Sequence, residues 1–142
     1  MNNLFLECPN GIVTEELNEF LCAQDWIVQI SLSDVNGIIA EATNAIVLSG
    51  KGSGINRCAD AIREAERNSH NIAGEHDLFS ADKAMLVICY PSDKSMLTSE
   101  LQPVDTFARR FHSKTKWIYG LAEKDGISEL EVTIIASNLH KS

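Results

Sequence analysis

The sequence predicts an α+β fold, with a four-stranded mixed β-sheet packed with two main helices and preceded by short helices. Stretches with the apolar spacing of helices alternate with apolar runs of strand length, and the last two strand candidates have no helix between them. The 142 residues are 44% hydrophobic and 23% charged, as in one globular domain with an ordinary core. Two full domains are therefore not expected.

The central strand is expected from Lys83 to Tyr90, where seven apolar or semi-apolar residues follow one lysine. The run stops at Pro91, and an unbroken apolar run of this length indicates a strand that is covered on both faces. A buried helix of this composition would usually be longer, and the β-branched Val87 and Ile88 favour a strand. The remaining elements must cover both faces of this strand.

Before the central strand, a short strand is predicted over residues 3–8 and a helix over residues 14–24. That helix is indicated by apolar residues at helical spacing, namely Leu17, Phe20 and Leu21. A short apolar segment from Trp26 to Ile30 then leads to a second helix through Val35 to Ile39. Ser33 stands where a helix cap is expected.

A compact strand candidate, Ala45 to Leu48, runs into the only glycine-rich stretch, Ser49 to Gly54. Glycine amides ahead of a helix can bind anions, but this spacing matches neither the P-loop nor the dinucleotide motif. We therefore expect a flexible turn between a strand and a helix. The helix is predicted from Ile55 to Asn68. Its apolar stripe consists of Ile55, Cys58, Ala59, Ile62 and Ala65.

A polar loop is predicted over residues 70–79, because its histidines and carboxylates fit no zinc signature. After the central strand, residues 99–102 form a capping box that opens another helix. The apolar face of this helix is Leu101, Val104, Phe107, Ala108 and Phe111. Strands are predicted over residues 116–122 and 130–137. Their connection is too short for a crossover, so they are expected to form an antiparallel hairpin.

The formal net charge of −8 argues against nucleic acid and anionic membrane surfaces as partners. No apolar run approaches the roughly 20 residues that cross a bilayer, and the start lacks the pattern of a signal peptide. We expect a cytoplasmic protein. The cysteines form no C-x-x-C pair, so free thiols are expected, with no zinc site or disulfide framework. They are Cys8, Cys22, Cys58 and Cys89.

The last strand candidate carries the most specific pattern. Residues 129–137 read E-L-E-V-T-I-I-A-S and closely resemble the closing strand of the C-terminal domain of FtsZ, the bacterial tubulin-like division protein, with its pattern E-L-x-V-T-(I/V)-(I/V)-A-T. Residues 54–57 resemble that family's G-E-(N/D)-R-A helix start, residues 83–90 its G-A-(K/R)-G-V-L strand, and residues 117–120 its I-I-(F/W)-G strand. The resemblance covers roughly residues 14–137 and implies the C-terminal domain fold of the tubulin/FtsZ superfamily.

The resemblance also implies a division of the chain. Residues 1–26 form an N-terminal extension resembling the end of the interdomain helix of FtsZ, and residues 27–142 an FtsZ C-terminal-like domain. The family's glycine-rich signature and its nucleotide-binding half have no counterpart in the sequence. We also expect no counterpart of the linker and peptide through which FtsZ meets membrane anchors. We therefore expect no GTP binding, no cofactor and no enzymatic activity.

The loop from Ile27 to Val35 resembles the family's L-I-N-x-D-F-x-D-V loop, which in FtsZ enters the nucleotide pocket of the next subunit. There, two aspartates help water attack the γ-phosphate. Gln29 stands at the asparagine position, Ser31 at the first aspartate and Asp34 at the second. Serine does not polarise water as a carboxylate does, so full stimulation of a neighbour's GTP hydrolysis is not expected. These three residues are the predicted binding residues, although a mere helix cap is the alternative for this loop.

Three functions are compatible with the sequence. The first, which we favour, is a non-catalytic protein that binds FtsZ or an FtsZ-like GTPase subunit and modulates filament assembly, for example by capping. The second is a self-associating scaffold, in which sheet edges or helix faces pair into a homo-oligomer. The third is a small-ligand-binding or enzymatic domain, which small α+β sheets often host. It has the least support, because His112 and His140 are isolated and no catalytic triad is visible.

Overall fold

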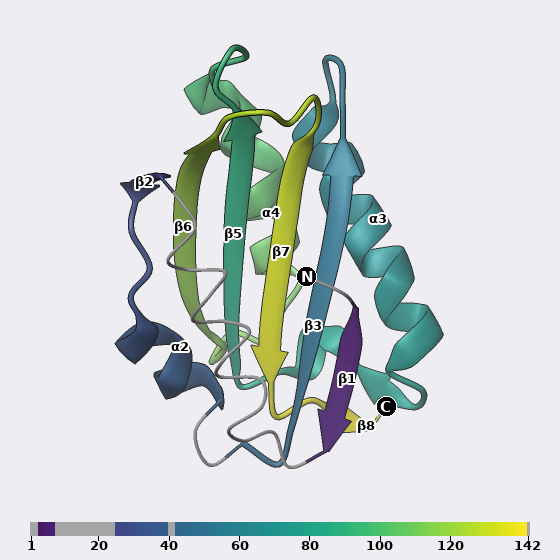
Figure 1. Cartoon of the computed structure of the whole chain (residues 1–142). Coiled ribbons are helices and arrows are strands. Elements are labelled where there is room, and N and C mark those ends of the chain that lie inside the picture. Colours follow the sequence, from purple (N-terminus) through teal and green to yellow (C-terminus); the bar gives the residue numbers. More distant parts are fainter. Residues whose placement is uncertain (1–2, 8–24, 40–41, 142) are drawn as a thin grey trace.

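The computed structural model describes residues 3–7, 25–39 and 42–141 (Figure 1). The helix predicted over residues 14–24 lies outside them. The strands are β1 (Leu4–Glu7), β2 (Asp25–Val28), β3 (Asn44–Gly52), β4 (His76–Asp77), β5 (Lys83–Pro91), β6 (Lys116–Lys124), β7 (Leu130–Ser137) and β8 (His140–Lys141). The helices are α2 (Leu32–Ile39), α3 (Arg57–Ile72) and α4 (Gln102–Arg109), with 3₁₀ turns η1 (Leu78–Ser80) and η2 (Thr98–Leu101). Within the described ranges, no helix combines the length and the apolar composition needed to span a bilayer.

The main sheet is mixed, and its six strands lie in the order β1-β3-β7-β5-β6-β2. Only β5 and β6 run parallel, and the other neighbours are antiparallel. The α+β class is confirmed, but the predicted count of four strands is wrong. The four predicted strands form the centre, and β1 and β2 extend it at the two edges. The strand predicted over residues 3–8 is confirmed as β1. The sequence shows only a short apolar segment near β2, and only pairing to β3 and β6 shows that β1 and β2 join the sheet.

Strand β5 is central, as predicted, with β7 on one side and β6 on the other. Every residue from Ala84 to Pro91 is buried. Leu86 and Ile88 belong to the core on one face of the sheet, and Met85 and Val87 to the core on the other. Two covered faces explain why the apolar run in the sequence is unbroken.

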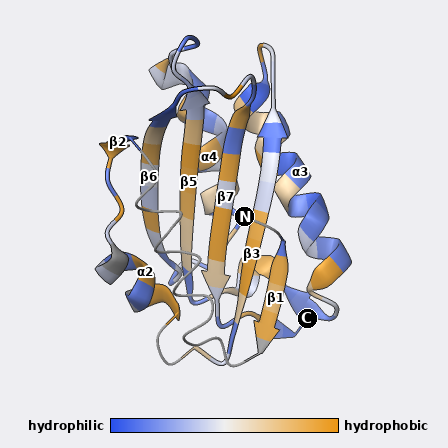
Figure 2. Cartoon of the chain, in the orientation of Figure 1, coloured by the Kyte–Doolittle hydropathy of each residue, from blue (hydrophilic) through white to orange (hydrophobic). Residues whose placement is uncertain are grey.

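Helices α3 and α4 cover one face of the sheet, and α2 lies on the opposite face (Figure 1). Colouring by hydropathy shows mainly apolar residues along β5 and β7 and a largely hydrophilic α3 (Figure 2). In strand β7, the alternate residues Leu130, Val132 and Ile134 lie in the core beneath α3 and α4. The two faces therefore have separate cores.

The predicted antiparallel hairpin of the last two strands is wrong, because β6 and β7 are not neighbours. Strand β5 lies between them, parallel to β6 and antiparallel to β7. The connection, residues 125–129, crosses the end of β5. Two strand spacings are about 10 Å, and five extended residues reach roughly 16 Å, so a short connection does not require direct pairing.

The glycine-rich stretch is not the flexible turn that its composition predicts, because residues Ser49 to Gly52 continue β3. A Cβ atom on Gly50 would lie 2.0 Å from the backbone oxygen of Ala61, and one on Gly52 would lie 2.0 Å from that of Arg57. These glycines let α3 approach β3 closely. Only residues 53–56 remain for the turn.

Helix α3 begins at Arg57 rather than at the predicted Ile55, which is exposed, and ends four residues later than predicted, at Ile72. Its buried residues are Arg57, Cys58, Ala61, Ile62, Ala65 and Ser69. The predicted loop over residues 70–79 is also partly wrong, since it contains the end of α3, β4 and the start of η1. Strand β4 pairs with β8, a long-range contact that local sequence does not reveal.

The predicted box at residues 99–102 is replaced by the 3₁₀ turn η2, which leads into α4. Glu100 reaches back to accept a hydrogen bond from the Leu97 N–H at 3.3 Å, and its own N–H donates to the Leu97 carbonyl at 2.9 Å. The apolar face predicted for α4 is largely confirmed, because Val104, Phe107 and Phe111 are buried.

Candidate functional site

The predicted binding residues lie where β2 leads into α2, on the face of the sheet opposite α3 and α4 (Figure 1). Gln29 and Ser31 are exposed, whereas Ile30 between them is buried. Gly120 of β6 makes room for this anchor. A Cβ atom there would lie 2.8 Å from Cδ1 of Ile30 and 2.9 Å from Cζ3 of Trp26. The buried side chain of Ile30 thus anchors the loop to the sheet.

Ser31 and Asp34 are brought together around the first turn of α2. The Ser31 N–H donates to Oδ2 of Asp34 at 3.0 Å, and the Asp34 N–H donates to Oγ of Ser31 at 3.1 Å. This reciprocal pair is an N-terminal capping box. The cap predicted at Ser33 is therefore wrong. Ser33 lies inside the helix, whereas Ser31 stands three residues before a carboxylate that can reach back to it.

The capping box also affects the ionisation of the Asp34 carboxyl. Hydrogen bonding to Ser31, above all to its backbone N–H, lowers the pKa of the Asp34 carboxyl more than its burial raises it. A carboxylate in the first turn is further favoured by the helix dipole. Since a general base works best with a pKa near the operating pH, this shift suits a fixed charge rather than proton transfer. The loop offers an oriented carboxylate, a serine and an exposed amide.

The resemblance selects three residues of this loop as predicted binding residues, but it does not indicate the bond between Ser31 and Asp34. A serine followed three residues later by an acidic residue is the capping-box motif, and positions 31 and 34 match it. This spacing could have predicted the bond. Gln29 lies two residues before the box and is exposed. The structure thus brings Ser31 and Asp34 into contact and leaves the Gln29 side chain at the surface.

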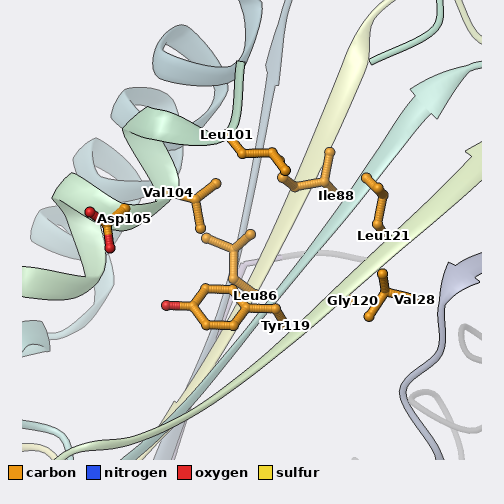
Figure 3. A pocket seen from close by; sticks show the side chains of 9 residues that line it. All are labelled: Val28, Leu86, Ile88, Leu101, Val104, Asp105, Tyr119, Gly120 and Leu121. Carbon is orange, nitrogen blue, oxygen red and sulfur yellow. The ribbon is translucent and has the colours of Figure 1, made fainter. Parts of the chain in front are cut away.

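Sequence reasoning missed an apolar groove, here named the α4 groove, between α4 and strands β5 and β6 (Figure 3). It has a volume of about 290 Å³ and an apolar lining of Val28, Leu86, Ile88, Leu101, Val104 and Leu121. Tyr119, which is exposed, also lines the groove, and Asp105 is its one charged lining residue within the described part of the chain. Partial burial, and then the charge of Asp105, raise the pKa of the Tyr119 hydroxyl. Helical spacing marks the α4 face as apolar but does not say that part of it stays open.

The described cysteines offer no activated nucleophile. Cys58 and Cys89 form no disulfide and are buried, and burial raises the pKa of each thiol to about 11. No group of three metal-ligating side chains occurs in residues 3–7, 25–39 and 42–141. His140 contacts Asp82, with Nε2 and Oδ1 3.2 Å apart, in an exposed pair.

No protein-family model matches the chain, and no curated protein does. Solved structures do match. An empty FtsZ dimer from M. jannaschii superimposes with a TM-score of 0.68 and 19% identity, covering 83% of this chain and 34% of that one. A mutant FtsZ from the same organism matches with a TM-score of 0.68 and 17% identity, over 92% of this chain and 42% of that one. TubZ of Bacillus thuringiensis serovar israelensis, in a GTPγS-form protofilament, matches with a TM-score of 0.66 and 10% identity. The match covers 90% of this chain and 34% of that one.

This chain therefore spans between 34% and 42% of the length of these proteins. The matched part of FtsZ is its C-terminal portion and not its GTPase domain. At these identities the likeness concerns the fold. It agrees with the resemblance of the closing strand and of the other sequence landmarks. The chain has the fold of the C-terminal domain of the tubulin/FtsZ superfamily.

Proposed function

We propose that this chain is a non-catalytic FtsZ-like protein that binds FtsZ or an FtsZ-like GTPase subunit and modulates filament assembly in cell division. The observation that carries the proposal is the exposed, braced loop from Gln29 to Asp34 on a fold shared with FtsZ and TubZ. The matching FtsZ is described as a dimer and the matching TubZ as a protofilament. Subunits of this fold are therefore found in assemblies.

The shape of the loop supports docking. Ile30 fastens the loop to the sheet, and the box of Ser31 and Asp34 fixes its exit into α2. A loop that is already ordered loses little conformational entropy when it binds. A standard interface of about 800 Å² per partner is roughly a tenth of the 7689 Å² surface of this chain. Such a contact requires only one face of the molecule.

The chemistry of the loop favours capping over stimulation of hydrolysis. Ser31 supplies no carboxylate, and Oδ2 of Asp34 already accepts a hydrogen bond. In the proposed complex, the loop meets the nucleotide face of a complete subunit without completing the hydrolytic machinery. The docked chain then occupies one filament end and slows growth.

The test is pelleting of full-length FtsZ polymers with GTP at increasing amounts of this chain, with phosphate release measured in the same samples. M. jannaschii FtsZ, a bacterial FtsZ and TubZ are assayed in parallel. A fall in polymer at substoichiometric amounts supports capping. Unchanged polymer and phosphate release with all three proteins, in the presence of a well-folded sample, contradicts it.

Variants assign the effect to the loop. Gln29→Ala changes an exposed side chain and leaves the capping box intact, so it should weaken capping without unfolding α2. Combining it with Asp34→Ala should weaken capping further. Ser33→Ala is the matched control, because Ser33 is exposed on the same turn but lies outside the box. Equal loss of capping with Ser33→Ala would assign the effect to something other than these contacts.

A further inference from the structure

Strand β2 contains one residue without a counterpart on β6. Trp26 and Val28 lie opposite consecutive residues of β6, Ala122 and Leu121, so Ile27 is inserted between two paired positions. Two residues on one strand opposite one on its neighbour form a β-bulge, which bends the strand and changes the direction of a side chain. Bulges are frequent at sheet edges and next to functional sites. Strand β2 is such an edge, because it ends the main sheet.

The bulge places the side chains of β2 in different surroundings. Trp26 packs on the α2 face of the sheet, where its Cζ3 lies 2.9 Å from the position of a Cβ atom on Gly120. Val28 lines the α4 groove on the other face. Residues i and i+2 of a regular strand share a face, so the inserted Ile27 accounts for this change of face. Among the described residues, Ile27 joins neither core nor the lining of the groove, and it is 58% exposed.

Ile27 is also held next to the loop from Gln29 to Asp34, here named the docking loop. Gln29 and Ser31 are exposed like Ile27, whereas Ile30 is buried. Trp26 and Ile30, on either side of Ile27, lie against the same glycine of β6. The side chain of Ile27 therefore projects from a segment that is fixed on both sides. The exposed surface of the docking loop continues through it from polar to apolar chemistry.

We infer that Ile27 is an apolar contact residue of the docking loop, and that its side chain enters an apolar pocket beside the nucleotide face of the bound FtsZ or FtsZ-like subunit. The inference rests on the proposed function and names the chemistry that the partner must offer. In protein interfaces, a few side chains that fill pockets on the partner supply most of the binding free energy. Gln29 and Asp34 offer polar contacts that fix the orientation, and Ile27 offers the burial.

Exposure alone does not carry this inference, because single exposed apolar residues are ordinary at protein surfaces. Ile55 is more exposed than Ile27, at 94%, but it lies in the turn between β3 and α3. In the order of the sheet, four strand spacings separate β3 from β2, which is roughly 19 Å. Ile27 differs by its bulge, its two fixed neighbours and its place beside the docking loop. Ile55 is therefore the matched control.

Fluorescence anisotropy of the chain, labelled at its N-terminus, tests the inference by measuring Kd. The partners are M. jannaschii FtsZ, a bacterial FtsZ and TubZ, each with GDP to limit polymerisation. Ile27→Ala should raise the Kd about tenfold or more for any partner that the original chain binds. Ile55→Ala removes the same atoms from a distant exposed site, and it should change the Kd less than about twofold.

Two further variants separate an apolar contact from an effect on the backbone. Ile27→Thr keeps the branch at Cβ, and with it the preference for a strand, but replaces part of the aliphatic side chain with a hydroxyl. Ile27→Leu loses that branch and keeps the apolar volume. The expected order of affinity is the original chain, then Ile27→Leu, then Ile27→Thr. Thermal melts of all variants check that the fold is intact.

Several results would overturn the inference. If the original chain binds a partner and Ile27→Ala binds it equally well, Ile27 makes no such contact, and docking through Gln29 and Asp34 still stands. Equal losses for Ile27→Ala and Ile55→Ala contradict the inference too. A larger loss with Ile27→Leu than with Ile27→Thr would show that backbone shape matters and not an apolar pocket. If the original chain binds none of the three proteins, the proposed function fails and this inference fails with it.

Discussion

Ser31 and Asp34 hold each other by two hydrogen bonds, each from the backbone N–H of one residue to the side chain of the other, at 3.0 and 3.1 Å. Both residues were singled out by resemblance to a loop that acts on a neighbouring subunit. Their contact adds a second role, which is to start α2 and to fix the direction in which the loop leaves β2. The same two side chains thus shape the surface that is proposed to bind.

Removing the Ser31 hydroxyl should destabilise the protein. Ser31→Ala leaves the Asp34 N–H without its side-chain acceptor, and loss of such a cap costs about 1 kcal/mol of unfolding free energy. Urea denaturation measures the change. Ser33→Ala is the control, because it alters an exposed helical serine outside the box and should change stability by less than about 0.5 kcal/mol. A larger cost at Ser33 than at Ser31 would refute the assignment of the cap.

The contribution of Asp34 should depend on pH. Its folded-state pKa lies below the ordinary value of 3.8, so its charged form stabilises the fold above that value. This stability is lost as the pH falls through the lowered folded-state pKa. Asp34→Asn should therefore be less stable than the original chain at neutral pH. The difference should shrink on acidification below the ordinary value. A difference that is independent of pH would show that the charge of Asp34 contributes nothing.

The Arg57–Glu100 pair should contribute more to stability than the Arg110–Glu66 pair. Glu100→Gln leaves a buried guanidinium without its counter-charge, and we expect a loss of roughly 2–3 kcal/mol of unfolding free energy. Hydrogen bonding to Arg57 also holds the pKa of Glu100 below its usual range. Glu66→Gln is the control, since the arginine of its pair, Arg110, is half exposed, and it should cost less than about 1 kcal/mol. Equal losses in denaturant titrations would contradict this ranking.

Two glycines should respond to alanine in opposite directions. Gly50→Ala places a Cβ atom 2.0 Å from the backbone oxygen of Ala61, so α3 must move away from β3 at a cost of about 1–3 kcal/mol. Gly37→Ala meets no atom within 4 Å and lies in helix α2. Alanine there should stabilise the protein by about 0.5–1 kcal/mol through helix propensity. Thermal melts of both variants check the prediction, which fails if Gly50→Ala is neutral.

The described thiols should be unreactive in the folded protein. A pKa of about 11 for Cys58 and for Cys89 leaves a thiolate fraction on the order of 10⁻³ at pH 8, and both side chains are buried. Alkylation followed by peptide mass spectrometry should label these two positions only at the rate at which the protein unfolds. Labelling in urea gives the control rate. Rapid labelling of either residue without denaturant would show that it is not sequestered.

The sequence by itself determined the elements that have a strong local period. The unbroken run of β5, the alternation of Leu130, Val132 and Ile134, and the apolar face of α4 all follow from the repeat of a strand or a helix. The landmarks of the resemblance lie within such elements. This is why the α+β class and the fold of the FtsZ C-terminal domain could be predicted.

The tertiary structure decided which strands are neighbours. Strand β5 enters between β6 and β7, and β1 and β2 extend the sheet, because pairing depends on backbone hydrogen bonds between distant residues and not on the local period. Likewise, Gly50 is a site of helix contact only because α3 folds back onto β3, and Ser31 is a cap only because Asp34 turns toward it. The α4 groove exists only in three dimensions. Composition and spacing define the parts, and long-range packing determines which surfaces those parts leave open.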